Sequence, residues 1–345
     1  MPTVNLLGLL PAELEALALT WGHSRFRGRQ LAQWMYRKGV ADLAAMTDLP
    51  KEFRAALGAR ASVAAPAVER VTSSLDGSRK LVLRFPDGAL VSAVLMPDGD
   101  RLTLCLSSQV GCGFGCAFCL TGTMGIERNL TPGEIVGQLL VANGLAPFGQ
   151  RVSHMVFMGM GEPLANLGSV LTAIRIFTDP RLGFGYSPRR ITVSTVGLAT
   201  GIDRLGGERL GVNLAVSLHA ASDEVRSRLM PVNRSWNLEA LMAAVRRYPR
   251  APRQQIFFEY VLLDGVNDAP GDAARLVRLL RGIPAKVNLI PFNDWEGAIF
   301  RRPALPRILA FQGILLKSGV TTTVRWSKGE DIGAACGQLR EAVPA

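Results

Sequence analysis

Three of the five cysteines of the chain lie within one short stretch, VGCGFGCAFCLTG at residues 110–122. Cys112, Cys116 and Cys119 have a Cys-x3-Cys-x2-Cys spacing, and the glycines between them let the backbone wrap closely around a compact group. An odd number of cysteines favours metal-binding or catalytic roles over a disulfide framework. Three thiolates can ligate three irons of a 4Fe-4S cluster and leave the fourth iron open to a small molecule.

Structural zinc is the main alternative for three clustered thiols. Zinc prefers four ligands, usually in two separated Cys-x2-Cys knuckles or as cysteines together with histidines. The histidines at positions 23, 154 and 219 are all distant from the loop in sequence, and Cys105 lies seven residues earlier on an expected strand. The spacing therefore favours an iron–sulfur cluster, while a zinc-dependent RNA-binding module without catalysis stays open.

The charge of the chain favours a polyanionic partner. A net charge of +11 suits RNA, DNA or an anionic membrane surface. No acidic residue occurs between Trp21 and Val40, where basic and aromatic residues interleave: Arg25, Phe26, Arg27, Arg29, Trp34, Tyr36, Arg37 and Lys38. Basic residues neutralise phosphates and exposed aromatics stack on bases, so the segment predicts an RNA-facing element. The alternative is that Trp34 and Tyr36 belong to the core and the arginines are merely solvated.

Nothing in the composition indicates a membrane protein. Hydrophobic residues make up 48% and charged residues 19% of the chain, which is typical of a globular protein with a large core. No apolar run is long enough to span a bilayer, and the apolar start has no Lys or Arg before Arg25, unlike a secretory signal. We expect a cytoplasmic protein without a membrane partner.

Strands that alternate with helices must position the cysteine loop. Strands are expected at 102–107, 153–158, 190–195, 212–218, 255–262 and 285–290, and helices at 132–143, 164–178, 222–229, 237–247 and 268–281. Thr131 and Glu134 form a capping box before the first of these helices. The alternation predicts an α/β fold of parallel strands with crossover helices, and about six units fit an open, partial barrel.

The chain is predicted to have four parts. Residues 1–60 are expected to form a small helical, RNA-facing domain, and residues 61–97 a linker with a β-hairpin at Asp-Gly turns. The partial barrel is expected over 98–328, and residues 329–345 form a C-terminal segment.

Several motifs closely resemble the RlmN/Cfr family of radical S-adenosylmethionine RNA adenine methyltransferases. They are, in order, TLCLSSQVGCGFGCAFCLTGTMGIERNLTPGEIVGQL, FMGMGEPLAN, VSLHA, FEYVLLDGVND, IPFN and GEDIGAACGQL. The N-terminal stretches FRGRQLAQWMYRKGV and LPKEFR also match, so the resemblance covers essentially the whole chain. It implies a radical S-adenosylmethionine (β/α)6 partial barrel, a 4Fe-4S cluster on the three clustered cysteines, and two S-adenosylmethionine molecules per turnover.

The resemblance also gives the remaining cysteines a role. Cys336, in AACGQL, matches the cysteine that takes a methyl group from S-adenosylmethionine and passes it to adenine. Cys105, in TLCLSSQ, matches the cysteine that resolves the covalent adduct by a transient disulfide with Cys336. Both steps are ordinary thiolate chemistry.

The cofactor-binding residues follow from the same motifs. Gly161 and Glu162, after the strand at 153–158, resemble the pair that receives the amino group of S-adenosylmethionine. The other matching positions lie at or just beyond later strand ends: Ser194, Ser217, Leu218, His219 and Asn293. Barrel active sites form at that rim, so the placement is physically coherent.

One position departs from the family pattern. Thirteen residues before Cys105 the family usually carries a glutamate, assigned as the base that removes the adenine proton, but this chain has Ser92. No carboxylate occurs between Asp87 and Asp98. A serine hydroxyl is a poor base at neutral pH, so water held by Ser92 or the Cys105 thiolate is expected to accept the proton.

The resemblance implies methylation of an adenosine at carbon 2 in 23S rRNA, with tRNA as a further candidate substrate. The alternatives are methylation at carbon 8, as in the other branch of the family, and a diverged radical enzyme acting on a peptide or small molecule. An electron donor such as flavodoxin or ferredoxin is implied, and a monomer is expected.

Overall fold

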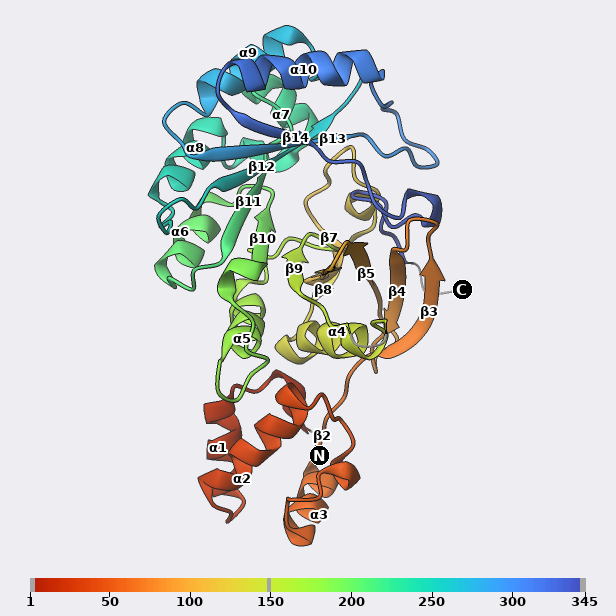
Figure 1. The fold of residues 1–345 in the computed structure, drawn as a ribbon, viewed down its shortest axis with the longest axis vertical. Helices are drawn as coiled ribbons and strands as arrows, with labels where there is room; N and C mark the ends of the chain where they lie inside the picture. The colour runs from red at the N-terminus through yellow and green to blue at the C-terminus, as the bar shows by residue number, and fades with distance from the viewer. Residues whose placement is uncertain (1–3, 148–149, 342–345) are drawn as a thin grey trace.

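The computed structural model describes residues 4–147 and 150–341, so the outer ends of the parts expected at 1–60 and 329–345 lie outside the described residues. The molecule is elongated, with a helical module at one end and a large sheet with its helices at the other (Figure 1). No helix among the described residues combines the length and apolarity needed to cross a membrane.

The N-terminal part is helical, as expected. It contains α1 (Pro11–Thr20), α2 (Arg25–Ala32) and α3 (Lys51–Arg60), and its ends pair as the short parallel strands β1 (Val4–Asn5) and β2 (Ala61–Ser62). The helix α2 continues as a π-helical turn over Gln33–Arg37 and stops at Gly39, whose φ of 67° only glycine adopts readily. Leu14, Leu31 and Phe53 are buried between the three helices.

Ten strands form one mixed sheet in the order β14-β13-β12-β11-β10-β9-β6-β5-β4-β3. The first seven in this order are parallel: β6 (Arg101–Cys105), β9 (His154–Phe157), β10 (Ile191–Thr195), β11 (Asn213–Ser217), β12 (Ile256–Leu262), β13 (Ala285–Pro291) and β14 (Thr321–Val324). All six expected strands are confirmed within two residues at each end. The sequence pattern did not predict β14, which is short and half exposed.

Helices connect the parallel strands. They are α4 (Pro132–Gly144), α5 (Leu167–Thr178), α6 (Ala199–Gly207), α7 (Asp223–Leu229), α8 (Leu238–Arg247), α9 (Pro270–Leu279) and α10 (Leu305–Lys317). The capping box of α4 is confirmed, because the Thr131 hydroxyl accepts from the Glu134 N–H and the Glu134 carboxylate accepts from the Thr131 N–H. Neither α6 nor α10 was predicted. The glycines of α6 weaken its signal, whereas α10 does carry helical spacing at its buried Ile308, Phe311 and Leu315.

The segment expected as a linker with a hairpin, residues 61–97, instead extends the main sheet. Its strands β3 (Ala67–Ser73), β4 (Arg79–Arg84) and β5 (Leu90–Asp98) are antiparallel, and β5 pairs with β6. The Asp-Gly turns lie where the sequence placed them, with positive φ at Gly77 and Gly88. Six consecutive buried residues, 90–95, show that both faces of β5 are covered, which a hairpin between two separate units would not require.

Candidate active site

The cysteine loop is bracketed by a hairpin that forms a separate two-stranded sheet. Gln109–Cys112 form β7 and Gly125–Asn129 form β8, and the two strands are antiparallel. Gly111 has a φ of 75°, and a Cβ there would lie 2.1 Å from the Gly125 carbonyl oxygen, so this position requires glycine. A Cβ at Gly122 would lie 3.1 Å from the backbone N and O of Cys116, a tight contact but a milder one. The loop is therefore folded tightly before any ligand is considered.

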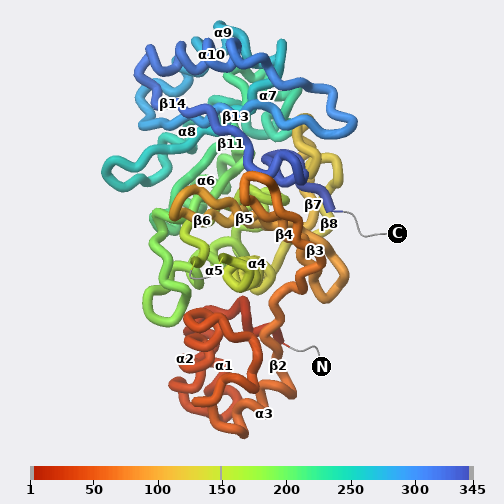
Figure 2. The backbone as a smooth tube through the Cα atoms, turned by 45° about the vertical axis from the view of Figure 1, so that its right-hand side comes forward, coloured from red at the N-terminus to blue at the C-terminus, as the bar shows by residue number. Residues whose placement is uncertain are grey.

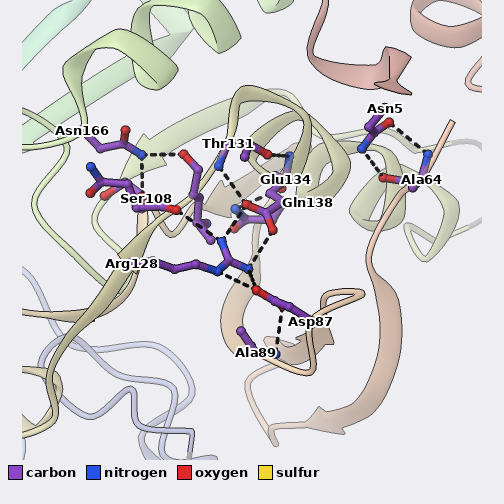
Figure 3. A network of polar contacts seen from close by, with 12 residues as sticks. Asn5, Ala64, Asp87, Ala89, Ser108, Arg128, Thr131, Glu134, Gln138 and Asn166 are labelled. Carbon is purple, nitrogen blue, oxygen red and sulfur yellow. Dashed lines mark hydrogen bonds and ion pairs between the residues drawn. The ribbon is translucent and has the colours of Figure 1, made fainter. Parts of the chain in front are cut away.

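A polar network fixes this hairpin to its neighbours (Figure 3). The Arg128 guanidinium on β8 donates to the Asp87 carboxylate at 2.7 Å and makes a bidentate contact with Glu134 of α4 at 2.9 Å. The Asn166 amide donates to the Ser108 and Leu130 carbonyls at 2.8 and 2.7 Å. Both ends of the cysteine loop are thus tied to helices and turns of the main sheet.

The three thiols of the loop lie close enough to raise one another's pKa. Burial raises the pKa of Cys112 to about 11, and burial together with the neighbouring Cys119 and Cys112 raises the pKa of Cys116 further. Within the described residues no three His, Cys, Asp or Glu side chains converge as single-ion ligands. A cluster differs because each thiolate binds its own iron. Buried, neighbouring thiols whose thiolate forms repel one another fit a bound iron–sulfur cluster, whose positive irons would favour the thiolates.

The cavity beside this loop lies at the carboxyl ends of the parallel strands. Six of the seven residues expected to bind the cofactor line it together with Cys119 and Cys336: Gly161, Glu162, Ser194, Ser217, His219 and Asn293. The seventh, Leu218, does not line it; its side chain is fully buried and its N–H donates to the Glu259 carbonyl. The strand-end placement expected from sequence therefore holds for the polar residues, and Leu218 belongs to the core.

Glu162 is held rigidly at the wall of this cavity. Gly161 precedes it with a φ of 95°, and a Cβ there would lie 2.5 Å from the Cβ of Gln109. The Glu162 carboxylate accepts from the N–H groups of Val196 and Leu164 at 2.8 and 3.0 Å. Burial raises its pKa to about 7 despite these bonds. A buried carboxylate with preset oxygens suits an ammonium group, which would restore its charge.

His219 is neutral in this site. Its Nδ1 accepts from the Val261 N–H at 3.0 Å, so the ring proton is on Nε2. Burial, and after it the nearby Arg226, lower its pKa to about 3. Its φ of 57° is unusual for a residue other than glycine and is held by Asn267, whose amide donates to the His219 carbonyl at 2.7 Å.

The two remaining cysteines meet at the end of β6. Cys336 lines the strand-end cavity and also a smaller neighbouring cavity that contains Cys105, so one thiol faces both spaces. Burial, with a smaller contribution from Cys336, raises the pKa of Cys105 to about 12. All five cysteines are free thiols. The structure thus brings Cys105 and Cys336 together, as the family resemblance implies.

Sequence reasoning missed two arginines of the site: the half-buried Arg325 lies near Cys336 and Cys105, and Arg226 lies near Cys116. Arg325 directly follows β14, lines both cavities, and has its pKa raised chiefly by the nearby Cys336. Arg226 of α7 is fully buried and donates to the Leu218 and Val196 carbonyls at 3.1 and 2.6 Å. Because β14 was not predicted, the sequence did not place Arg325 at a strand end, and α7 gave no sign that Arg226 is buried.

A second cavity of about 480 Å³ opens at the other end of the same strands. It shares Met158, Glu259 and Arg325 with the strand-end cavity. Six cations line it against the two carboxylates of Asp98 and Glu259: Arg101, Arg189, Arg190, Lys286, Arg325 and Lys328. Such a lining favours a polyanion, and the sequence did not reveal it because these residues come from four segments that lie far apart in the chain.

In the basic-aromatic segment at the N-terminus, residues 21–40, some side chains belong to the core and others form an exposed surface. Tyr36 is buried and its hydroxyl donates to the Leu9 carbonyl at 2.6 Å, so it belongs to the core. Phe26 is 53% exposed, and the Lys38 ammonium lies 3.4 Å from the centre of the half-buried Trp34 ring. The exposed part of this segment retains the basic and aromatic character of an RNA-facing surface.

The thiol loop, the acidic strand-end cavity and the crossover fold define a class, the radical S-adenosylmethionine enzymes. Residues 106–277 match the radical SAM superfamily, and residues 4–63 match the N-terminal domain of ribosomal RNA large subunit methyltransferases. The chain belongs to the RlmN family of radical S-adenosylmethionine RNA methyltransferases.

Relatives of nearly full length support this placement. Two proteins named dual-specificity RNA methyltransferase RlmN are similar: one from Syntrophobacter fumaroxidans is 51% identical over 95% of each chain, and one from Geotalea uraniireducens is 48% identical over 99% of this chain and 97% of its own. The crystal structure of a radical SAM methyltransferase from Sphaerobacter thermophilus superposes with a TM-score of 0.94 at 46% identity, covering 98% of this chain and 99% of its own.

Proposed function

We propose that this chain methylates carbon 2 of an adenosine in 23S rRNA and in tRNA, with Cys336 as the methyl carrier. The position of Cys336 carries the proposal, because a carrier must face its methyl source on one side and its release partner on the other. Cys336 lines the strand-end cavity and the small cavity of Cys105. The name dual-specificity RNA methyltransferase, borne by relatives of about half identity, supports both RNA classes as substrates.

Carbon 2 of adenine is electron-poor and has no lone pair, so it cannot displace a methyl group from S-adenosylmethionine. A 4Fe-4S cluster held by Cys112, Cys116 and Cys119, with two molecules of S-adenosylmethionine per turnover, would supply the required radical chemistry when bound. The chain itself contributes the thiolate of Cys336 as methyl acceptor. Cys105 is placed to free that sulfur by pairing with it as a disulfide. An electron donor such as flavodoxin or ferredoxin is expected.

The walls of the strand-end cavity would hold S-adenosylmethionine. Glu162 would accept its ammonium group, with Gly161 leaving room for close approach. Ser194, Ser217 and Asn293 offer further polar atoms, and neutral His219 would donate through Nε2. Leu218 would contribute only through the backbone around His219.

The second cavity would receive the RNA. Its six cations are suited to phosphates, and it meets the strand-end cavity at Met158, Glu259 and Arg325. We infer a partial (β/α)6 barrel over 98–328 with this opening at one rim and the cofactor at the other. The helical domain over 1–60 would add RNA contacts, and 329–345 would carry Cys336. A cytoplasmic monomer is consistent with this assignment.

Nucleoside analysis of RNA methylated in vitro tests the proposal. Anaerobically reconstituted protein with labelled S-adenosylmethionine is expected to yield 2-methyladenosine in protein-free 23S rRNA and in tRNA. Cys336→Ala should retain the cluster and give no methylated RNA. Formation of 8-methyladenosine would assign the protein to the carbon-8 reaction instead, and an absence of any methylated adenosine would overturn the proposal.

A further inference from the structure

A carboxylate from the far end of the chain lies beside Ser92, the serine that replaces the expected glutamate. The Ser92 hydroxyl is fully buried and donates to Oε1 of Glu341 at 2.7 Å. The Lys80 ammonium contacts the same oxygen at 2.7 Å, and Arg70 lies 3.3 Å from Oε2. The Glu341 side chain is only 5% exposed. A charge so deeply buried requires such partners, and all three come from β3, β4 and β5.

This contact lies on the same face of β5 as the two catalytic thiols. Side chains alternate along a strand, so Ser92, Val94 and Met96 point to one side. Val94 pairs with Cys105 across the strands, and both Val94 and Met96 line the small cavity that contains Cys105 and Cys336. The C-terminal segment therefore runs along this face from Cys336 to Glu341, and Figure 2 shows it, in dark blue, beside β4 and β5.

The ends of this segment are held in different ways. Near Cys336, the Asn293 amide donates to the Cys336 carbonyl at 2.9 Å, and the Leu120 N–H donates to the Gly337 carbonyl at 2.7 Å. Beyond it, Leu339 packs in the small cavity and its carbonyl accepts from the Thr121 hydroxyl. Glu341 makes the charged contact that ends the described chain.

The surroundings of Glu341 favour anchoring over proton transfer. Its Oε1 already accepts from both Ser92 and Lys80 at 2.7 Å, so this oxygen is engaged in holding the two side chains. Neither Glu341 nor Ser92 lines either cavity around Cys336. A carboxylate in this setting acts on Cys336 through the chain between them.

We propose that Glu341 is a positioning residue whose ion pair with Lys80, completed by Ser92, anchors the C-terminal segment and keeps Cys336 between the cofactor cavity and Cys105. The importance of that position rests on the proposed function, but the anchor itself does not. The Glu341 carboxylate, which accepts from the Ser92 hydroxyl, lies where the carboxylate of a longer side chain at position 92 would lie. The serine is therefore required here, because a second carboxylate would compete for Lys80.

The test measures how readily Cys336 reacts in the full-length, anaerobically reconstituted protein. Iodoacetamide alkylation of Cys336 is followed by peptide mass spectrometry in wild type, Glu341→Gln and Ser92→Glu. Loss of the anchor makes local opening of the segment easier, so both variants should alkylate Cys336 faster by roughly tenfold. Glu69→Gln is the matched control, because Glu69 pairs with Arg84 at an exposed site on the same strands and should leave the rate unchanged.

Two further measurements keep the test decisive. Glu341→Gln leaves Lys80 buried without a counter-charge, so Lys80→Ala/Glu341→Ala, which removes both charges, is measured if the single variant fails to fold. Methyl transfer to Cys336 without RNA should slow in all anchor variants. Unchanged alkylation in every variant would overturn the anchor. Unchanged loading of Cys336 with a collapse of RNA methylation in Glu341→Gln would also overturn it and make Glu341 the base.

These outcomes are separable from failure of the proposed function. If wild type methylates no RNA, the alkylation rates still report whether Glu341 restrains Cys336. If RNA is methylated normally by every variant while alkylation changes, the anchor exists but does not position Cys336 for transfer, and the proposal fails in that part.

Discussion

The two rims of the parallel strands use opposite electrostatic strategies. The carboxyl-end cavity is lined by buried groups whose pKa values are far from normal, such as Glu162 at about 7 and His219 at about 3. The amino-end cavity is lined by cations, several of them exposed, including Arg189 and Arg190. At the first rim, burial of polar groups costs desolvation free energy but fixes a few atoms in the positions that a small ligand needs. The second rim gathers charges that stay solvated.

This difference gives the two rims different roles: the first selects a ligand, and the second attracts one. Preset, desolvated groups discriminate between small ligands because an unmatched buried polar atom is costly. Solvated cations attract any polyanion and contribute mainly to affinity, with a strong dependence on salt. Arg325 lines both cavities, and Cys336 lines the carboxyl-end cavity with it, so a methyl group on Cys336 would lie near the point where the two environments meet.

The largest expected effect comes from the thiols of the carboxyl-end rim. Cys116→Ala should reduce bound iron from about four atoms per chain to a small fraction, because a cluster needs three thiolates here. Cleavage of S-adenosylmethionine should disappear with it. Iron analysis and absorption spectra after anaerobic reconstitution measure the first effect. Cys105→Ala is the control and should keep its iron; full iron content in Cys116→Ala would refute the cluster assignment.

Cys105 lines the small cavity beside Cys336 at the carboxyl end of β6, so its loss should stop the cycle at a later point. Cys105→Ala should load Cys336 with methyl and react once with RNA, then remain covalently attached because no thiol can release it. Denaturing gels and tryptic mass spectrometry should find RNA linked to Cys336 in this variant and not in Cys105→Ala/Cys336→Ala. Repeated turnover by Cys105→Ala would show that release does not require this thiol.

Glu162 gives the carboxyl-end rim a pH dependence that the other rim should lack. Its folded pKa of about 7 exceeds the ordinary value, so the folded protein without cofactor holds a proton that the unfolded chain has lost. Its stabilising contribution is complete below about pH 4.5 and is lost as pH rises through about 7, by up to roughly 3 kcal/mol. Glu162→Gln should lack this loss. Urea unfolding at pH 5 and pH 8 compares the two proteins, and parallel pH profiles would contradict the assignment.

The amino-end rim should respond to salt instead. Arg189→Gln/Arg190→Gln removes two exposed cations from its wall, so the slope of log affinity for RNA against log salt should fall by roughly 1.4 to 1.8. Cleavage of S-adenosylmethionine without RNA should be unchanged. Arg246→Gln/Arg278→Gln, on the outer surfaces of α8 and α9, has the same charge change and should leave the slope closer to wild type. Equal slopes for the two double variants would remove the case for this cavity.

The sequence predicted local elements and motifs well because their signals are local. Periodicity and caps located six parallel strands and the start of α4, and the cysteine spacing located the ligand loop. Contacts over long sequence separation could not be predicted in this way. Ser92 and Glu341 are 249 positions apart, and no pattern near either residue indicates the other. The burial of Arg226 and the gathering of cations at the amino-end rim also depend on packing of distant segments.

The linker expected at 61–97 shows a second limit. Alternating residues and Asp-Gly turns correctly indicated strands there, but a hairpin pattern does not state which edge its strands will join. Pairing of Val94 with Cys105 gives this segment a role in the site, because it supplies the wall behind both thiols. Leu218 shows a limit of motif matching. The motif places Ser217, Leu218 and His219 together at the strand end, but neighbouring side chains point in opposite directions, and that of Leu218 is buried in the core.

The smallest effect is expected in the N-terminal segment, where two substitutions test whether Tyr36 serves the core and Phe26 serves RNA binding. Tyr36 is buried and donates to the Leu9 carbonyl, so Tyr36→Phe should lower the free energy of unfolding by about 1 kcal/mol and leave RNA affinity unchanged. Phe26 is exposed, so Phe26→Ala should change stability by less than about 0.5 kcal/mol. It should weaken RNA binding, because an exposed ring can stack on a base. Urea unfolding and RNA titrations at fixed salt measure both properties for both variants. If Phe26→Ala binds RNA as wild type does, the aromatic face of α2 is only a solvated surface, and the amino-end cavity must hold the RNA without it.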